Sequence, residues 1–381
     1  MKEGWEYCQL EDTVKKGSSN ISLNKIKGED GEYPVFAAKG FVQNVSFYHQ
    51  EEDYLAIIKD GAGIGRVSKH PAKSSVVGTM QYLIPKKGFD IDFIKYFLEA
   101  IDFEKHRNGS TIPHIYFKDY KSEKFPKIPL PEQQRIVSIL EKAFTAIDKA
   151  KANAEQNLQN AKELFESYLQ GIVSNGDQWE KKTLAQIAKT FGRGKSKHRP
   201  RNWKGLYGGD YPFIQTGDIR NSKHHITEYS QTYNEVGLAQ SKLWPAGTIC
   251  ITIAANIAET GVLTFDACFP DSVIGIEVNE KVADREFVEY LLQSFKVRIQ
   301  ALGKGSAQAN INLGTFENEL FPFPPVSEQK EIVDKLNQLY NECERLENVF
   351  LRKIYDLEEL KKSILQKAFA GELETEKAVA V

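Results

Sequence analysis

Residues 129–137, PLPEQQRIV, return as residues 325–333, PVSEQKEIV, and this repeat decides the fold. Each copy opens a long segment in which apolar residues recur with helical spacing. The same offset carries Gly109-Ser110 onto Gly305-Ser306 and residues 164–170 onto residues 360–366. Because internal repetition dictates architecture, the sequence predicts a duplicated module, in which a globular part is followed by a long helix.

The repeat also reaches the front of each half. Trp5-Glu6 is echoed by Trp179-Glu180, and Tyr33-Pro34 by Tyr211-Pro212. Between these positions and the repeated Gly-Ser pair the two halves diverge, and the second half is the longer one. Two variable parts on a constant frame favour a protein that recognises two different things at a fixed separation. The predicted organisation is a globular domain at residues 1–128, a helix at 129–176, a second domain at 177–324 and a second helix at 325–381.

Composition restricts the class of protein. A chain of 381 residues accommodates two globular domains with their own cores. The mean hydropathy of -0.44 and the lack of a long apolar run or an apolar leader predict a cytoplasmic protein without a membrane span. The four cysteines, Cys8, Cys250, Cys268 and Cys343, are scattered, so we expect neither a zinc site nor disulfides. The net charge of -2 means that any nucleic-acid contact must come from local basic patches.

Both helical segments alternate four-residue and three-residue apolar steps without a break, which is the spacing of a coiled coil. Asn157 and Lys353 are the polar positions of the two predicted seams and fall at the same step, where a single polar residue can fix register. Gly176 and Gly371 are the candidate helix stops. The predicted seam residues are Ile136, Leu140, Ile147, Asn157 and Leu164 in the first helix and Ile332, Leu336, Leu346, Phe350, Lys353 and Leu357 in the second.

The two seams are complementary, since the first helix offers Ala at several steps where the second offers Leu or Phe. We therefore predict that the helices pack against each other in one chain, antiparallel, with a globular domain at either end. The alternative is two unrelated amphipathic helices, each lying on its own domain. A helix of about forty residues is roughly 60 Å long, more than one small domain needs, so the pair is expected to act as a spacer.

The globular parts mix short apolar runs with turns and helical segments. Residues 54–58 and 247–253 are predicted strands, and residues 91–105 and 284–302 are predicted helical segments, so the expected class is α+β. The glycines of Gly61-x-Gly63-x-Gly65 do not have the spacing of a dinucleotide-binding loop. We find no set of residues typical of nucleophilic or metal-assisted catalysis, and we expect no catalytic residues in this chain.

Residues 193–204, RGKSKHRPRNWK, carry six lysines and arginines and no acidic residue. Flexible cations at this density suit phosphates and guanine edges, and the alternative is a solvated basic loop. The candidate contact residues in the first domain are Lys39, Lys59, Arg66, Arg107, Ser110, Thr111 and His114. Those in the second domain are Arg193, Lys195, Lys197, Arg199, Arg201, Thr216, Arg220, Asn256, Ser306, Gln308 and Asn310.

Taken together, these features resemble the specificity subunit of type I restriction-modification systems. The resemblance is carried by the paired helix openers, the closing residues 365–371, LQKAFAG, the two Tyr-Pro turns and the glycine run at 61–65, and it extends over essentially the whole chain. The first closing element, residues 169–173, is degenerate. The basic loop has only a weak counterpart at residues 15–19, so the first domain is expected to depend more on Lys39, Lys59 and Arg66.

The resemblance implies two target-recognition domains, each reading one half of a split double-stranded DNA sequence. It implies an internal pseudo-twofold repeat whose two helices set the spacing and bind two methyltransferase subunits. S-adenosylmethionine is then expected in the partner methyltransferase, with no cofactor in this chain, and cleavage is expected in a separate motor-nuclease subunit. The competing interpretation is a coiled-coil adaptor whose two end domains bind protein partners.

Overall fold

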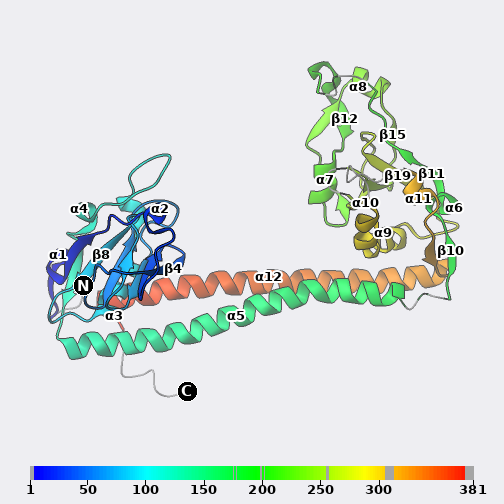
Figure 1. The fold of residues 1–381 in the computed structure, drawn as a ribbon. Coiled ribbons are helices and arrows are strands. Elements are labelled where there is room, and N and C mark those ends of the chain that lie inside the picture. The colour runs from blue at the N-terminus through cyan, green and yellow to red at the C-terminus, as the bar shows by residue number, and fades with distance from the viewer. Residues whose placement is uncertain are drawn as a thin grey trace. The chain divides into compact units, whose positions relative to one another are not determined.

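The computed structural model describes residues 4–174, 176, 178–197, 200, 202–254, 257–304 and 313–373. The chain divides into two compact units, shown in Figure 1. Unit 1 comprises Met1–Gln156 and Phe350–Val381, and unit 2 comprises Asn157–Val349. Each unit therefore contains one globular domain and a part of each long helix. None of the helices in the described ranges combines the length and the apolar composition needed to cross a bilayer.

The domain of unit 1 is built on two small sheets and a two-stranded ribbon. The first sheet has the order β2-β8-β5-β6, and the second has the order β4-β3-β7. The strands are β1 (Glu6–Gln9), β2 (Val14–Ser18), β3 (Tyr33–Ala37), β4 (Gly40–Val45), β5 (Tyr54–Ile58), β6 (Val67–His70), β7 (Ser75–Val76), β8 (Met80–Pro85) and β9 (Lys124–Lys127). The helices are α1 (Leu10–Thr13), α2 (Leu23–Ile26), α3 (Ile91–Ala100), the short η1 (Phe103–His106) and α4 (Phe117–Tyr120).

The domain of unit 2 repeats this plan with additional strands. Its sheets have the orders β11-β19-β16-β17-β13 and β14-β12-β18-β15. The strands are β10 (Glu180–Lys182), β11 (Ala188–Arg193), β12 (Tyr207–Phe213), β13 (His225–Ile226), β14 (Gln231–Tyr233), β15 (Leu243–Trp244), β16 (Ile249–Thr252), β17 (Thr260–Leu263), β18 (Ala267–Cys268), β19 (Val273–Val278) and β20 (Phe321–Phe323). The helices are α6 (Leu184–Ile187), η2 (Lys204–Leu206), α7 (Thr216–Asn221), α8 (Glu235–Ala239), α9 (Arg285–Ser294), α10 (Lys296–Lys304) and α11 (Leu313–Glu317).

The shared plan follows from the shared sequence pattern. β5 and β16 are buried along their whole length, because each lies inside its sheet with a strand on either side. α3 and α9 follow the last strand of each main sheet, and each begins at an aspartate whose side chain caps the helix, Asp90 and Asp284. The predicted duplication and the α+β class are confirmed.

The two long helices, α5 (Leu130–Ser174) and α12 (Val326–Ala370), pack antiparallel. In unit 1, the beginning of α5 lies beside the end of α12 (Figure 1), and Ile136 and Leu140 share one core with Leu365 and Ala368. In unit 2, the end of α5 meets the beginning of α12, where the rings of Phe165 and Tyr340 lie 5.4 Å apart. The predicted pairing is thus confirmed, and the alternative of two helices that each lie only on their own domain is wrong.

The predicted seam residues are buried in the first part of each helix, and several of those farther along are exposed. Ile136, Leu140, Ile147, Ile332 and Leu336 are buried, and Phe350 and Leu357 are half-buried. Asn157, Leu164, Leu346 and Lys353 are exposed, whereas the next residue in each case, Leu158, Phe165, Glu347 and Ile354, is half-buried. A straight helix has 3.6 residues per turn, so its buried stripe drifts away from a strict seven-residue repeat by about 20° per heptad. Asn157 and Lys353 therefore do not form a polar step in the seam.

Candidate nucleic-acid interface

The basic segment of unit 2 leaves the end of β11 at Arg193. The Arg193 Nε donates a hydrogen bond to the Asp271 carbonyl at 2.7 Å, and the Gly194 N–H donates to the Val273 carbonyl at 2.8 Å. A side chain at position 194 would clash, because a Cβ there would lie 2.2 Å from the Phe269 carbonyl oxygen. Farther along, the Ser241 hydroxyl donates to the Lys195 carbonyl at 2.9 Å. The segment is therefore tied to the domain at its start, while the side chains of Lys195 and Lys197 are exposed.

A groove of about 610 Å³ lies next to this segment. It is lined by Ser196, Asn202, Lys204, Tyr207, Phe213, Gln215, Thr216, Gln231, Pro270 and Ser272. Thr216 and residues of the basic segment therefore line the same groove. Inside the groove the Gln215 Nε2 donates to the Gln231 Oε1 at 3.0 Å.

This lining has the functional groups that read base edges. Side-chain amides pair with adenine, and lysine pairs with guanine or with phosphate. Gln231 is exposed and Gln215 is half-buried, so both amides are within reach of a ligand. The aromatic rings of Tyr207 and Phe213 form the apolar part of the wall.

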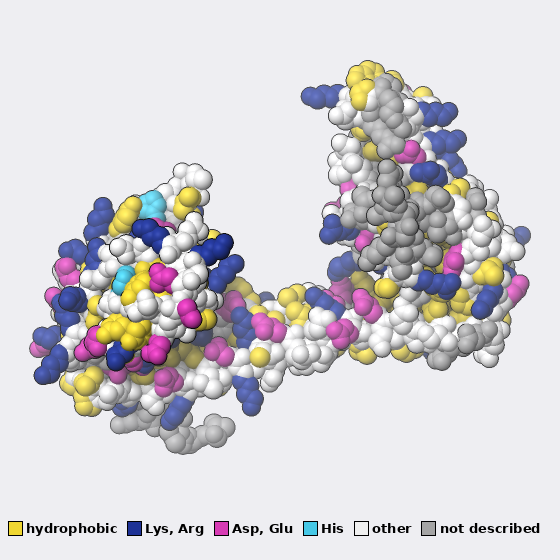
Figure 2. All heavy atoms as spheres, viewed as in Figure 1, with side chains coloured by type: hydrophobic (Ala, Val, Ile, Leu, Met, Phe, Trp, Pro, Cys, Tyr) yellow, Lys and Arg dark blue, Asp and Glu magenta, His cyan; other side chains and the backbone are white. Residues whose placement is uncertain are grey.

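Positive charge accumulates at the start of the basic segment, where Lys242 lies near Lys195. Burial lowers the pKa of Lys242, and the neighbouring charge of Lys195 lowers it further. The Lys242 Nζ lies 3.4 Å from the centre of the Trp244 ring, which holds the ammonium group in place. Figure 2 shows Lys and Arg side chains projecting from the part of unit 2 that carries α8 and β12 in Figure 1. A polyanion such as DNA would relieve the repulsion between these cations.

The remaining candidates of unit 2 do not line the groove or lie outside the described residues. Arg220 is exposed in the last turn of α7, one turn away from Thr216. The candidates outside the described residues are Arg199, Arg201, Asn256, Ser306, Gln308 and Asn310.

In unit 1, two loops come together around Lys59. The Ile115 N–H donates to the Lys59 carbonyl at 2.9 Å, and the Gly61 N–H donates to the Pro113 carbonyl at 2.9 Å. Asn108 and His114 exchange backbone hydrogen bonds of 2.8 and 2.9 Å, which closes the second loop. The candidates gathered on these two loops are Lys59, Arg107, Ser110, Thr111 and His114.

A smaller cavity of about 220 Å³ lies beside these loops. Lys59 lines it together with Lys16, Ser18, Gln81 and Lys118. Lys16 and Ser18 belong to β2, the strand equivalent to β11. The weak counterpart at residues 15–19 thus lies almost entirely in the strand, whereas the basic loop follows the end of β11.

Lys39 and Arg66 are not part of this group. Lys39 is exposed in the turn between β3 and β4, next to Phe41, whose side chain is also exposed. Arg66 lines a different cavity of about 720 Å³, together with Glu99 of α3 and Lys362 of α12. Lys39, Lys59 and Arg66 therefore lie at three different places in unit 1, and the expectation that the first domain depends on them stays a prediction.

Sequence reasoning missed Gln215, Gln231 and the paired histidines His224-His225. The only local signal for Gln215 is its position two residues after the end of β12. Nothing in the linear sequence joins it to Gln231, because the two residues meet only through the fold.

The comparisons with known proteins agree with this geometry. A family model described as "Type I restriction modification DNA specificity domain" matches residues 2–158 and 176–354. The chain is 23% identical to the EcoDI specificity subunit of Escherichia coli over 411 residues, covering 97% of this chain and 88% of the relative. It is 25% identical to the MjaX specificity subunit of Methanocaldococcus jannaschii, described as putative, over 97% of this chain and 94% of the relative.

Two solved structures share the fold. The HsdS subunit from Thermoanaerobacter tengcongensis superposes with a TM-score of 0.61 at 16% identity, covering 98% of both chains. A chain from a study of complex assembly and conformational transition of the type I R-M system gives a TM-score of 0.78 at 16% identity, covering 98% of this chain and 99% of the other. Because the family model covers most of both halves, this chain belongs to the family of type I restriction-modification DNA specificity proteins.

Proposed function

We propose that this chain is the DNA-recognition subunit of a type I restriction-modification complex. Each of its two domains reads one half of a bipartite target in double-stranded DNA. The pair α5 and α12 sets the spacing between the half-sites and docks the methyltransferase subunits.

The observation that carries this proposal is the duplicated domain plan attached to a duplicated helix. The strand orders β2-β8-β5-β6 and β11-β19-β16-β17 are equivalent, yet the loops that follow β2 and β11 differ in sequence. A constant scaffold with different loops is what two readers of different half-sites require. The coiled-coil adaptor, the alternative considered from the sequence, is not favoured by the family match.

Direct readout of DNA is supported by the groove of unit 2. Its amide and ammonium groups are typical of base contacts in the major groove, and the exposed Lys195 and Lys197 beside it are suited to phosphates. Recognition of the other half-site is assigned to the loops around Lys59 and His114 in unit 1.

The chain has no catalytic role of its own in this proposal. The methyltransferase subunits bring S-adenosylmethionine, and a separate motor-nuclease subunit cuts the DNA. Docking on the helices is supported by apolar side chains that remain exposed on α12, including Leu351, Tyr355 and Leu360. Exposed apolar residues on a long helix are typical of a surface that binds another protein.

The test is to express the chain with the methyltransferase subunit of its own system and to map methylated bases in the host genome. We expect one bipartite, asymmetric motif in which both halves are modified. The purified chain alone should transfer no methyl group from S-adenosylmethionine to DNA. Transfer by the homogeneous chain, or a continuous motif without a gap, would contradict the proposal.

A further inference from the structure

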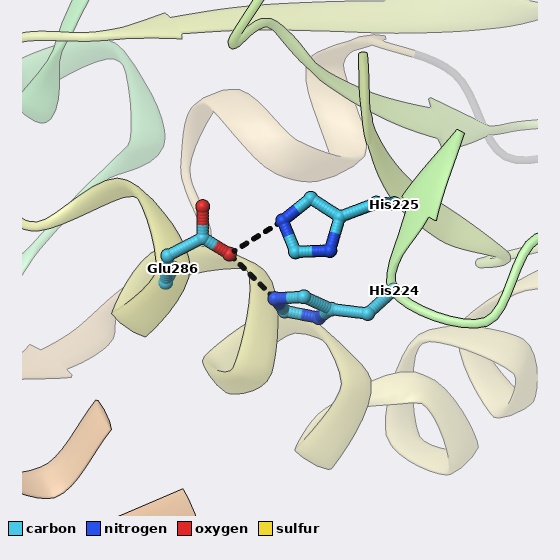
Figure 3. A group of neighbouring side chains, drawn as sticks. All are labelled: His224, His225 and Glu286. Carbon is cyan, nitrogen blue, oxygen red and sulfur yellow. Dashed lines mark hydrogen bonds and ion pairs between the residues drawn. The ribbon is translucent and has the colours of Figure 1, made fainter. Parts of the chain in front are cut away.

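Three side chains that DNA recognition does not use converge in unit 2. His225 is the first residue of β13 and His224 directly precedes it, and Glu286 comes from the first turn of α9 (Figure 3). Figure 3 shows the Glu286 carboxylate turned toward both imidazole rings. Its Oε2 lies 2.5 Å from the His224 Nε2 and 3.3 Å from the His225 Nε2.

The other nitrogen of His224 faces a second carboxylate. The His224 Nδ1 lies 2.5 Å from the Glu289 Oε2, and the side chain of Glu289 is fully buried. Thr260 donates a hydrogen bond to the Glu289 Oε1 at 2.8 Å, and the Gln293 amide donates to both carboxylate oxygens at 2.8 and 2.9 Å. Glu289 is therefore held in place by neutral donors and orients the His224 ring.

This arrangement has the two layers of a protein metal site. A histidine that binds a metal through one ring nitrogen usually presents the other to a carboxylate, which fixes the ring and raises its basicity. The outer face of Glu286 is also held, because the Arg285 Nε donates to its Oε1 at 3.4 Å. The other carboxylate oxygen of Glu286, Oε2, faces the two imidazole rings.

We propose that the His224 Nε2, the His225 Nε2 and the Glu286 Oε2 bind one divalent transition-metal ion, with Zn²⁺ as the best fit. All three atoms lie within 4.8 Å of one another. Ligand atoms on a tetrahedral zinc ion are about 3.3–3.5 Å apart, so His224 and Glu286 need to separate by about 1 Å. Two imidazoles and one carboxylate favour zinc over calcium or magnesium, which take oxygen ligands.

The site is accessible from solvent. The His225 side chain is 46% exposed and the Glu286 side chain 22%, whereas the His224 side chain is only 8% exposed. An ion can therefore enter on the His225 side, and a water molecule is expected to fill the fourth position. Burial alone would lower the pKa of His224, but Glu286 and Glu289 raise it to about 9. A metal ion would replace that proton as the positive charge between the two carboxylates.

The ion would fasten an additional strand to the domain. β13 has only two residues and pairs with β17 alone, and the described sheet β2-β8-β5-β6 of unit 1 contains no equivalent strand. In unit 1, Asp92 follows the capping Asp90 by two residues, as Glu286 follows Asp284, and it pairs with Lys69 at 2.7 Å. In unit 1 the acidic residue of α3 thus pairs with Lys69, whereas in unit 2 the acidic residue of α9 pairs with the two histidines.

The same cluster connects the domain to the long helix. The ring of His224 stacks on Tyr290 with centroids 4.4 Å apart, and the Tyr290 hydroxyl donates to the Asn337 Oδ1 of α12 at 2.6 Å. A bound ion would therefore hold β13, α9 and α12 together within unit 2.

The test uses the full chain and Co²⁺ as a spectroscopic probe of the metal site. We expect one Co²⁺ per chain with visible absorption bands of four- or five-coordinate cobalt, and loss of these bands when Zn²⁺ is added. Zn²⁺ should also raise the Tm of the full chain. Neither effect depends on DNA or on the methyltransferase, so failure here is distinguishable from failure of the proposed function.

The variants His225→Gln and Glu286→Gln should each lower Co²⁺ affinity at least tenfold and abolish the rise in Tm. His225 is half-exposed, so its replacement should leave the fold intact, which far-ultraviolet circular dichroism checks. Glu289→Gln should lower affinity roughly 10–100-fold. Glu280→Gln is the matched control, because Glu280 is an exposed carboxylate near Arg285 outside the cluster, and it should behave like the parent chain.

Three results would overturn the proposal. One is that the folded parent chain binds no Co²⁺, and another is that His225→Gln binds it with unchanged affinity and spectrum. The third is an intense sulfur-to-cobalt charge-transfer band, which would place the ion on the cysteines.

Discussion

Gln133 fastens the start of the long helix α5 to the start of α3 through Asp90: its Oε1 accepts a hydrogen bond from the Asp90 N–H at 2.8 Å. Its Nε2 donates to the carbonyls of Ile128 and Gly88 at 2.8 and 3.2 Å. Gln329 repeats the contact in unit 2, where it accepts from the Asp284 N–H at 2.7 Å and donates to the Pro324 carbonyl at 2.7 Å. Both glutamines are fully buried. This contact explains why the repeated helix opener has a glutamine at the same step in both copies.

Replacing Gln133 with Leu should destabilise unit 1 by about 2–3 kcal/mol, because buried backbone groups lose their partners. The midpoint of urea denaturation, monitored by Trp and Tyr fluorescence, measures the loss. Gln329→Leu should have a similar effect on unit 2. Gln134→Leu is the matched control, since Gln134 is exposed and should change stability by less than about 0.5 kcal/mol. Equal midpoints for Gln133→Leu and Gln134→Leu would contradict this role.

The sequence predicted the two helices, their start and their antiparallel pairing, because these depend on periodicity that is visible along the chain. The stop at Gly371 was also predictable, and the residue has the positive φ of 77° that a helix end favours. The exposure of Asn157 and Lys353 could not be predicted from the seven-residue repeat. A shift of one residue in the buried stripe accumulates from the difference between 3.5 and 3.6 residues per turn.

The candidate site could be predicted only in part. The density of cations in residues 193–204 identified one wall of the groove, and the repeated Gly-Ser element identified the loop that carries Ser110 and Thr111. Gln215 and Gln231, which also line the groove, precede α7 and begin β14, and the fold brings them to the loop. Side-chain contacts between distant segments leave no local pattern in a single sequence.

Lys195 and Lys197 are expected to contact phosphates of one half-site. Each change to Ala should weaken binding of the reconstituted complex to all DNA sequences and should reduce the salt slope by about one unit. Fluorescence anisotropy over a range of salt concentrations measures both quantities. Lys281→Ala, an exposed lysine of the same unit outside the groove, should leave them unchanged. An unaltered salt slope in the Lys195→Ala, Lys197→Ala double variant would mean that the segment is merely solvated.

Gln231 is expected to contact a base edge. Gln231→Ala should cost roughly 1–3 kcal/mol at one base pair of one half-site and leave the other half-site unaffected. Methylation of DNA libraries with single substitutions in each half-site resolves the position. A uniform loss across all positions would instead identify Gln231 as a phosphate contact or as a structural partner of Gln215.

His70 should make unit 1 less stable in mild acid. Burial lowers its pKa from 6.5 to about 4, and its ring stacks on Tyr54 while Ser68 lies 2.8 Å from its Nε2. The unfolded chain therefore binds a proton that the folded chain excludes. The contribution of neutral His70 is complete above pH 6.5 and is lost as the pH falls toward about 4, by an amount on the order of 2–3 kcal/mol.

The measurement is the denaturation midpoint of the parent chain and of His70→Gln between pH 7 and pH 5. The parent should lose stability over this window, and the variant should show a shallower dependence. His224 acts in the opposite direction between pH 7 and pH 6, because its pKa is raised to about 9 and only the unfolded chain gains a proton there. Its contribution is the same in the parent and in His70→Gln, so the difference between their slopes reports His70. His114→Gln, which removes a histidine from a surface loop of the same unit, should keep the parent slope. A parental slope in His70→Gln would show that another group titrates.

The length of the helix pair should set the gap between the two half-sites. Inserting seven residues after Asn157 of α5 and seven after Phe350 of α12 lengthens each helix by about 10 Å and rotates its faces by only about 20°. Both insertions lie at the boundary between the units, so the residues that bind either domain to its helices are untouched. DNA rises roughly 3.4 Å per base pair, so the preferred gap should grow by up to about three base pairs while the half-sites stay the same.

Methylation of libraries with a randomised spacer by the reconstituted complex measures the gap. A four-residue insertion in α5 alone is the control: it rotates the buried stripe by about 40° relative to its partner and should impair assembly rather than change the gap. If the elongated chain methylates targets with the original gap at full rate, the helices do not determine the spacing.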